Sequence, residues 1–246
     1  MQSSKHVRNL RSTSAAIMGL SIEVGILADL KENDPEGGVH FRNEFQLLNR
    51  YLGTRGLPAH NEPDTCDVWS CAMYGYSGLH YLRRIAAHYD LKATLPLPGD
   101  TNSSEDPILQ QYYRDFERPR AGIIGKLFGT GRRKRSFDHL IIHSDAEGYY
   151  IPQDFPDVLI PGKDVPIAGG IVGSSHRLLS ECQRLAEFLG LPRDIGEESE
   201  ELWSAVESQG EGDIQWKRYG IESFSCVRLK AAAQRSIETG AAIVFN

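Results

Sequence analysis

The chain has 246 residues, of which 40% are hydrophobic and 24% are charged, and its formal net charge is −6. These values are typical of a globular protein that buries a core in one large domain or two small ones. The negative charge gives the chain no general attraction to nucleic acid or to an anionic membrane surface. No apolar run is long enough to span a bilayer, so we expect no membrane-spanning helix.

Four cysteines are too few for a disulfide framework in a chain of this length. They contain no Cys-x-x-Cys pair, and their spacing does not match a set of zinc ligands. We therefore expect free thiols, no cofactor and a reducing cytoplasmic location. The four are Cys66, Cys71, Cys182 and Cys226.

The first 17 residues carry Lys5, Arg8 and Arg11 and no acid. The alternating apolar pattern of a strand starts only after them. We expect residues 1–17 to form a mobile extension and residues 18–246 to form a single domain. Within that domain, a variable basic loop is expected near residues 118–136.

A strand followed by a helix is predicted at the start of the domain. Apolar residues alternate within 19–28, as in a half-buried strand. Asp34 is suited to a helix N-cap and Pro35 to the first helical position. Two glycines follow, so the helix begins either there or nearer Val39. Gly53 is expected to end it.

A second strand and helix follow. Residues 65–73 alternate as a strand, and Ser77 is predicted to cap the next helix. The region 95–136 is rich in Pro, Gly and Asn and should be irregular. A short helix is expected inside it near residues 107–116.

Residues 139–151 are predicted to form a β-hairpin. Residues 139–142 are mostly apolar, residues 144–148 are turn-forming, and residues 149–151 are β-prone. Tyr149 and Tyr150 would point to opposite faces of the strand. We therefore expect one of these two rings in the core and the other at the surface.

Helices dominate the C-terminal part. The periodicity predicts helices over 175–189, 197–208 and 228–238, with Gly190 after the first, and a closing strand over 242–245. Helices outnumber strands, and strands and helices do not alternate regularly. We therefore predict a single-domain α+β fold with a mixed or antiparallel sheet, a hairpin near 139–151 and about five helices.

His143 and Asp145 form a His-x-Asp pair in the predicted hairpin. On a strand, such a pair shares one face and, with a distant histidine such as His176, could ligate a metal as a facial triad. The competing interpretation is a hairpin loop in which Gly148 adopts a positive φ. The turn is the favoured interpretation, and no metal site is predicted.

A glycine-rich stretch, residues 169–175, precedes the helix over 175–189. Backbone amides at such a helix start can bind an anion, although no Walker lysine follows. A serine N-cap after a tight turn explains the same residues. If the hairpin turn and this helix start converge, the candidate ligand-binding residues are His143, Asp145, Glu147, Gly173, Ser174, Ser175 and His176.

Five segments resemble a family of uncharacterised bacterial proteins. They are MGLSIEVGILADL (18–30), SGLHYLRRIAAHY (77–89), HSDAEGYYIPQDFPDVL (143–159), GGIVGSSHRLL (169–179) and SIETGAAIVF (236–245). The resemblance covers nearly the whole chain from Met18, and the basic stretch 126–135 resembles a variable insertion. It implies a single-domain soluble cytoplasmic protein and assigns no activity, so no catalytic residue follows from it.

The sequence favours a non-enzymatic partner-binding protein of the immunity type. It contains no catalytic motif, and the acids in 197–213 would suit a basic protein partner. The first alternative is an enzyme or small-ligand binder that uses the converging loops described above. The second is nucleic-acid contact through the basic stretch 126–135, which a solvated loop explains better. No oligomeric state is indicated.

Overall fold

The computed structural model describes residues 20–98, 102–117, 135–162 and 164–245. The expected extension 1–17 and most of the expected basic loop 118–136 lie outside these residues. In the described part, no helix is both long and apolar enough to cross a membrane.

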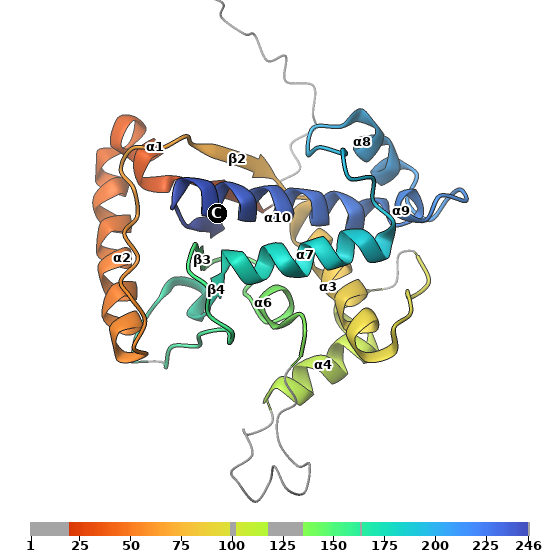
Figure 1. Cartoon of the computed structure of the whole chain (residues 1–246), viewed down its shortest axis with the longest axis horizontal. Helices are drawn as coiled ribbons and strands as arrows, with labels where there is room; N and C mark the ends of the chain where they lie inside the picture. The colour runs from red at the N-terminus through yellow and green to blue at the C-terminus, as the bar shows by residue number, and fades with distance from the viewer. Residues whose placement is uncertain (1–19, 99–101, 118–134, 163, 246) are drawn as a thin grey trace, which may run out of the picture.

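Nine α-helices and five strands make up the described part of the chain (Figure 1). In the first half they are β1 (Ser21–Val24), α1 (Ile26–Asn33), α2 (Pro35–Thr54), β2 (Trp69–Ala72), α3 (Gly75–Lys92) and α4 (Pro107–Glu117). In the second half they are α6 (Asp138–Ile141), β3 (Tyr149–Ile151), β4 (Val172–Ser174), α7 (Ser175–Leu189), α8 (Glu200–Glu207), α9 (Gln215–Arg218), α10 (Gly220–Thr239) and β5 (Ile243–Phe245).

The five strands form one open, mixed sheet in the order β2-β1-β5-β3-β4. The β3–β4 pair is parallel, and the other pairs are antiparallel. The two edges are therefore β2 and β4. The predicted single-domain α+β fold is confirmed.

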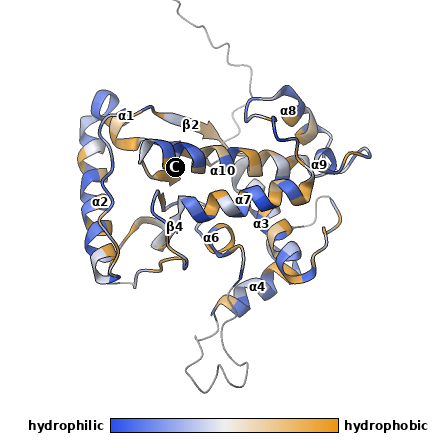
Figure 2. Ribbon diagram, in the orientation of Figure 1, coloured by the Kyte–Doolittle hydropathy of each residue, from blue (hydrophilic) through white to orange (hydrophobic). Residues whose placement is uncertain are grey.

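Helices cover both faces of the sheet. On one face, α1 and α2 pack against Tyr149 and Val244, and on the other α3, α7 and α10 pack against Tyr150 and Ile243. Figure 1 shows α7 and α10 side by side across the middle of the molecule and α2 at its left edge, and Figure 2 shows hydrophilic residues along the outer side of α2. Because both faces are covered, both tyrosines are buried. The expectation that one of the two rings is exposed is wrong.

The predicted hairpin near 139–151 is also wrong. The chain forms the short helix α6 over Asp138–Ile141, and β3 pairs with β4 and β5. The Glu181 carboxylate on α7 accepts hydrogen bonds from the backbone N–H groups of His139 at 3.1 Å and Leu140 at 2.7 Å. These N–H groups lie at the start of α6, where no intrahelical acceptor exists, so Glu181 stabilises a helix there.

Capping residues set several helix ends where the sequence predicts them. The Asp34 side chain accepts from Gly37 N at 3.1 Å, so α2 begins at Pro35 despite the glycines. The Ser174 hydroxyl caps α7, and Gly190 ends it with φ 74°. Other boundaries differ from the prediction: α3 begins before Ser77, and α10 begins at Gly220, well before residue 228.

The β3–β4 pair gives a prediction about packing. Gly173 lies opposite Tyr150, and a Cβ on Gly173 would collide with the tyrosine ring. We expect Gly173→Ala to lower the free energy of unfolding by about 1–3 kcal/mol, as overpacking of a core does. Urea unfolding measures this change.

Gly53→Ala is the matched control. A Cβ on Gly53 meets nothing within 4 Å, and Gly53 lies inside α2. Alanine is the better helix former, so the free energy of unfolding of this variant should stay the same or rise by up to about 0.5–1 kcal/mol. Equal stabilities for the two variants would contradict the packing role of Gly173.

Candidate functional site

His143 lies in the core. Its side chain is 2% exposed and stacks on Tyr150 with ring centroids 3.9 Å apart. Nδ1 lies 3.0 Å from the Ser144 carbonyl oxygen and Nε2 lies 3.2 Å from that of Tyr149. Burial lowers the pKa of His143 to about 4, so the ring is neutral at physiological pH. A ring so enclosed presents no nitrogen to a ligand.

Asp145 is half-buried and forms ion pairs with two side chains of α3. Its Oδ2 lies 2.9 Å from His80 Nε2, and its Oδ1 lies 3.4 Å from Arg83 Nη1. The hydrogen bond from His80 and the Arg83 charge hold the pKa of Asp145 far below its usual range. The carboxylate therefore stabilises the 143–148 loop on α3.

The candidate residues at the glycine-rich helix start do not share a site, and each of the buried ones has its own partner within the fold. Gly173 contacts the ring of Tyr150, and the Ser174 hydroxyl donates to the Gln153 carbonyl at 2.6 Å. Ser175 Oγ lies 2.7 Å from Ser236 Oγ in the core. His176 is exposed.

The two loops do approach each other, through a hydrogen bond from a backbone N–H to the Glu147 side chain. Gly169 N donates to Glu147 Oε2 at 3.3 Å, and β3 pairs with β4 beside them. His143 is buried there while His176 is exposed. In the part of the chain that the structure describes, no three His, Cys, Asp or Glu residues are arranged to hold a metal ion. His143, Asp145 and His176, the alternative metal-ligand set, are therefore not arranged to hold a metal ion in the described part of the chain.

Residues 194–213, here called the acidic segment, have a charge that differs from that of the rest of the chain. The segment contains eight acids and no Lys or Arg, which gives −8 against a net −6 for the whole chain. The remainder therefore carries +2. All of these acids except the half-buried Glu197 are exposed. The eight are Asp194, Glu197, Glu198, Glu200, Glu201, Glu207, Glu211 and Asp213.

Helix α8 turns this charge outward. Leu202, Ala205 and Val206 lie on one face of α8 and are buried in a small apolar cluster with Phe224 and Val227 of α10. The glutamates occupy the opposite face, as expected of an amphipathic helix on a core. Figure 1 shows α8 at the edge of the molecule.

Few of these carboxylates are neutralised. Lys217 Nζ lies 3.6 Å from Glu201 Oε2, and Arg228 Nη2 lies 3.4 Å from Glu198 Oε1. Within the described ranges, the other six acids form no ion pair. Trp203 and Ile214 lie among them with 40% and 52% of their surfaces exposed. The surface therefore combines unpaired negative charge with two apolar side chains.

Arg228 on α10 holds the acidic segment against the sheet. This arginine is 3% exposed, and it donates to the Ala72 carbonyl at 2.5 Å and to the Glu197 carbonyl at 3.2 Å. Its guanidinium lies over the rings of Phe224 and Trp203, 4.3 and 5.1 Å from their centroids. One cation thus fixes the end of β2, the start of the acidic segment and α8.

A second acidic group lies at the other end of β2. Lys31 and Asp64 form an ion pair at 3.6 Å, which joins α1 to the loop before β2. Figure 1 shows β2 running between α1 and α8. The edge strand is therefore flanked by acids at both ends. The exposed acids of the second acidic group are Glu32, Asp34, Glu36, Asp64 and Asp67.

Comparison with protein families identifies the relationship. A family model described as "Putative DNA-mimic protein" matches residues 18–245. The chain belongs to this family. No curated protein and no solved structure matches the chain.

The family corrects the function and the partner expected from the sequence. A DNA mimic is directed at proteins that bind DNA, so the immunity-type function is wrong, and so is the general basic partner. The alternatives at the 143–148 loop and at the basic stretch 126–135 gain no support from it; residues 126–134 also lie outside the described residues.

The sequence contains a stronger signal than the His-x-Asp pair. Twenty residues with eight acids and no base are visible without a structure, but we expected only the acids in 197–213 to matter. Asp194 and Trp203 were missed. Arg228 has no sequence signal, because its partners lie far away along the chain.

Arg228 gives a testable stability prediction. We expect Arg228→Met to lower the free energy of unfolding by about 2–3 kcal/mol, because buried carbonyls lose a charged donor. Amide hydrogens of α8 should also exchange faster in this variant than in the wild type, whereas exchange in α2 should stay the same. Arg218→Met, at an exposed position, is the control and should change neither quantity. Equal exchange rates in α8 for Arg228→Met and the wild type would argue against the role of Arg228.

A second prediction concerns pH. The pKa of His143 is about 4 in the folded protein against an ordinary 6.5, so its contribution to stability is present above 6.5 and is lost as pH falls through 4. We expect the free energy of unfolding to fall between about pH 7 and 4. The fall should be smaller in His143→Gln but unchanged in His176→Gln. Identical pH profiles for all three proteins would refute a neutral buried His143.

Proposed function

We propose that the protein is a DNA mimic that occupies the DNA-binding surface of a DNA-binding protein. The observation that carries this proposal is the charge segregation, in which the acidic segment holds −8 in a chain of net −6. Membership of the DNA-mimic family supports it. Exposed carboxylates would take the place of phosphates in contacts with Lys and Arg of the partner.

The spacing of the α8 carboxylates suits this role. Glu200 and Glu207 lie seven residues apart, which is about 10 Å along a helix axis. Each DNA strand carries one charge per about 3.4 Å of axis, so α8 spans about three phosphates. Glu201 lies beside this line and adds charge to the same face.

The second acidic group would extend the mimic. Between Asp67 and Ala72 the chain advances about 17 Å, at roughly 3.3 Å per residue of strand. That length corresponds to about five base pairs. Two groups of carboxylates separated by a neutral edge strand provide the partner with two negative arrays, as the two strands of a duplex do.

The exposed Trp203 distinguishes this surface from DNA. Tryptophan is a frequent binding hot spot in protein interfaces, and Trp203 is fixed by Arg228 and packs on Phe224 with ring centroids 4.7 Å apart. The carboxylates would steer the DNA-binding surface of the partner to this site, and the ring would add apolar contact after docking. Selectivity among DNA-binding proteins would then come from Trp203 and Ile214.

Displacement from DNA tests the proposal. Lysate proteins are bound to immobilised duplex DNA, and the purified protein is added. We expect it to release at least one DNA-binding protein. The triple variant Glu200→Gln, Glu201→Gln, Glu207→Gln should need about tenfold more protein for the same release, and added salt should weaken the effect.

The control variant is Glu147→Gln, Asp164→Asn, Glu238→Gln. These acids are exposed, lie outside both acidic groups and change the net charge by the same amount. The control should act like the wild type. Release that is absent, or equal for both triple variants, would overturn the proposal.

A further inference from the structure

A second candidate site lies between α6 and α7. A pocket of about 450 Å³ opens there, and its lining includes Arg135, His139, Arg177, Ser180, Glu181 and Arg184. The volume lies within the range of small-molecule sites. The nine lining residues include three arginines and two acids, Asp138 and Glu181.

One face of α7 forms a wall of the pocket. Arg177, Ser180, Glu181 and Arg184 are spaced i, i+3, i+4 and i+7, so their side chains leave the helix on the same side. The opposite wall is formed by Arg135 and the α6 residue His139. Ser180 is exposed at this surface and supplies a hydroxyl.

His139 lines the pocket from the α6 side. Its Nδ1 accepts a hydrogen bond from Ser174 N at 3.0 Å, so in the neutral ring Nε2 carries the proton. A hydrogen bond with the Pro156 backbone raises the pKa of this ring, which is 2% exposed, but burial has the larger effect and lowers the pKa to about 4. The backbone therefore holds His139 in place, and the ring shapes the wall of the pocket.

The arginines differ in their partners. Arg135 forms ion pairs with Asp115 and Asp90, and Arg177 with Asp154 at 2.6 Å. Arg184 forms no ion pair within the described ranges: it donates to the Ser136 carbonyl and lies 4.3 Å from the centroid of the Phe137 ring. Its buried Nε has no hydrogen-bond partner there either. Among the arginines of the lining, Arg184 is therefore the one without an ion pair to a described residue.

Glu181 does not oppose an anion at this site. Its carboxyl group is committed to the backbone of α6, and burial raises its pKa to about 8. At neutral pH it is mainly protonated, because the pH lies below that pKa. Glu181 therefore adds little negative charge to the lining, in which Asp138 is the other acid.

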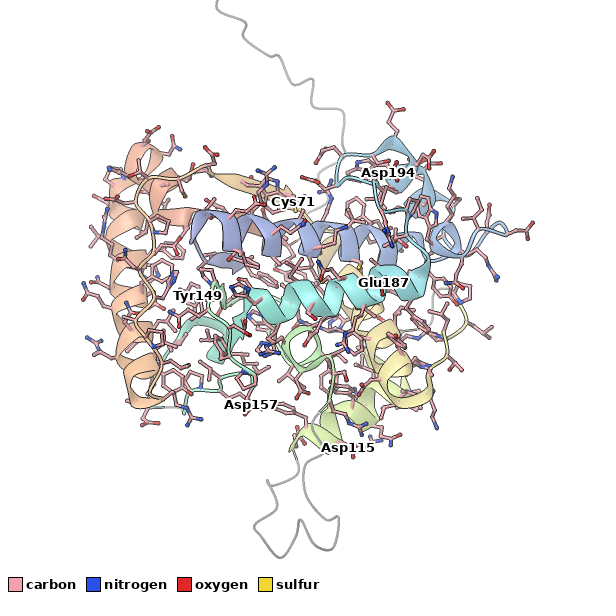
Figure 3. All side chains as sticks on the ribbon, viewed as in Figure 1. Cys71, Asp115, Tyr149, Asp157, Glu187 and Asp194 are labelled. Atoms are coloured by element: carbon pink, nitrogen blue, oxygen red, sulfur yellow. The ribbon has the colours of Figure 1, made fainter. Side chains whose placement is uncertain are left out.

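We infer that this pocket binds a small phosphate-bearing molecule through Arg184, Arg177 and Ser180. Guanidinium groups bind phosphate oxygens with paired N–H donors, and a hydroxyl adds one more. The volume exceeds that of a single phosphate, so an organic moiety fits beside it. Figure 3 places Asp115, the partner of Arg135, at the opposite end of the molecule from Asp194 of the acidic segment. This site is independent of the proposed DNA mimicry.

Isothermal titration calorimetry of the full chain tests the inference, with inorganic phosphate and AMP as probes and sodium chloride at matched ionic strength as the blank. We expect saturable binding of at least one probe, with Kd of about 1 mM or below. Binding of phosphate alone assigns the site to the free anion, and binding of AMP alone assigns it to an organic phosphate. Either result supports the inference. No saturable binding of either probe overturns it.

Two variants connect the binding to the pocket. Ser180→Asp adds an acid at an exposed position and should weaken binding about tenfold or more without lowering Tm, and Arg184→Gln should do the same to binding. Ser204→Asp, on exposed α8, is the matched control and should bind like the wild type. Unchanged binding in Ser180→Asp, or equal loss in Ser204→Asp, would place the anion elsewhere and refute the inference.

Discussion

The buried guanidinium of Arg228 is the interaction on which the acidic surface depends. It binds the carbonyls of Ala72 and Glu197 and stacks on Trp203, so one side chain joins the sheet edge, the acidic segment and α8. The cost of holding eight acids in 20 residues is mutual repulsion. A buried cation at the base of the segment and the apolar face of α8 offset that repulsion, while most carboxylates remain free on the outer side.

The sequence predicts local structure well where local chemistry decides it. Asp34 and Ser174 cap helices through their own side chains, so α7 begins where expected and α2 begins at Pro35, the earlier of its two expected starts. The hairpin prediction is wrong because a short apolar run suits a strand or a buried helix equally. The carboxylate of Glu181 decides between them, and it comes from a helix some 40 residues later. Such a long-range hydrogen bond has no local signature.

In the candidate site, too, some features can be predicted from the local sequence and others depend on the fold. His143 and Asp145 attracted attention by residue type, yet burial and ion pairs commit both to the structure. Residue type cannot reveal burial. Charge distribution along the chain requires no such knowledge, and the acidic segment is visible in the sequence itself. Its outward orientation, and the Arg228 contact that fixes it, require the fold.

The central claim is that the acidic surface takes the place of DNA. The most direct measurement is hydrogen exchange on a partner displaced from duplex DNA, compared free, bound to DNA and bound to this protein. The account predicts that both ligands protect the same backbone amides of the partner, because carboxylates and phosphates contact the same basic side chains. Protection of a different surface by the protein, with the DNA-binding amides left exchanging freely, would contradict it.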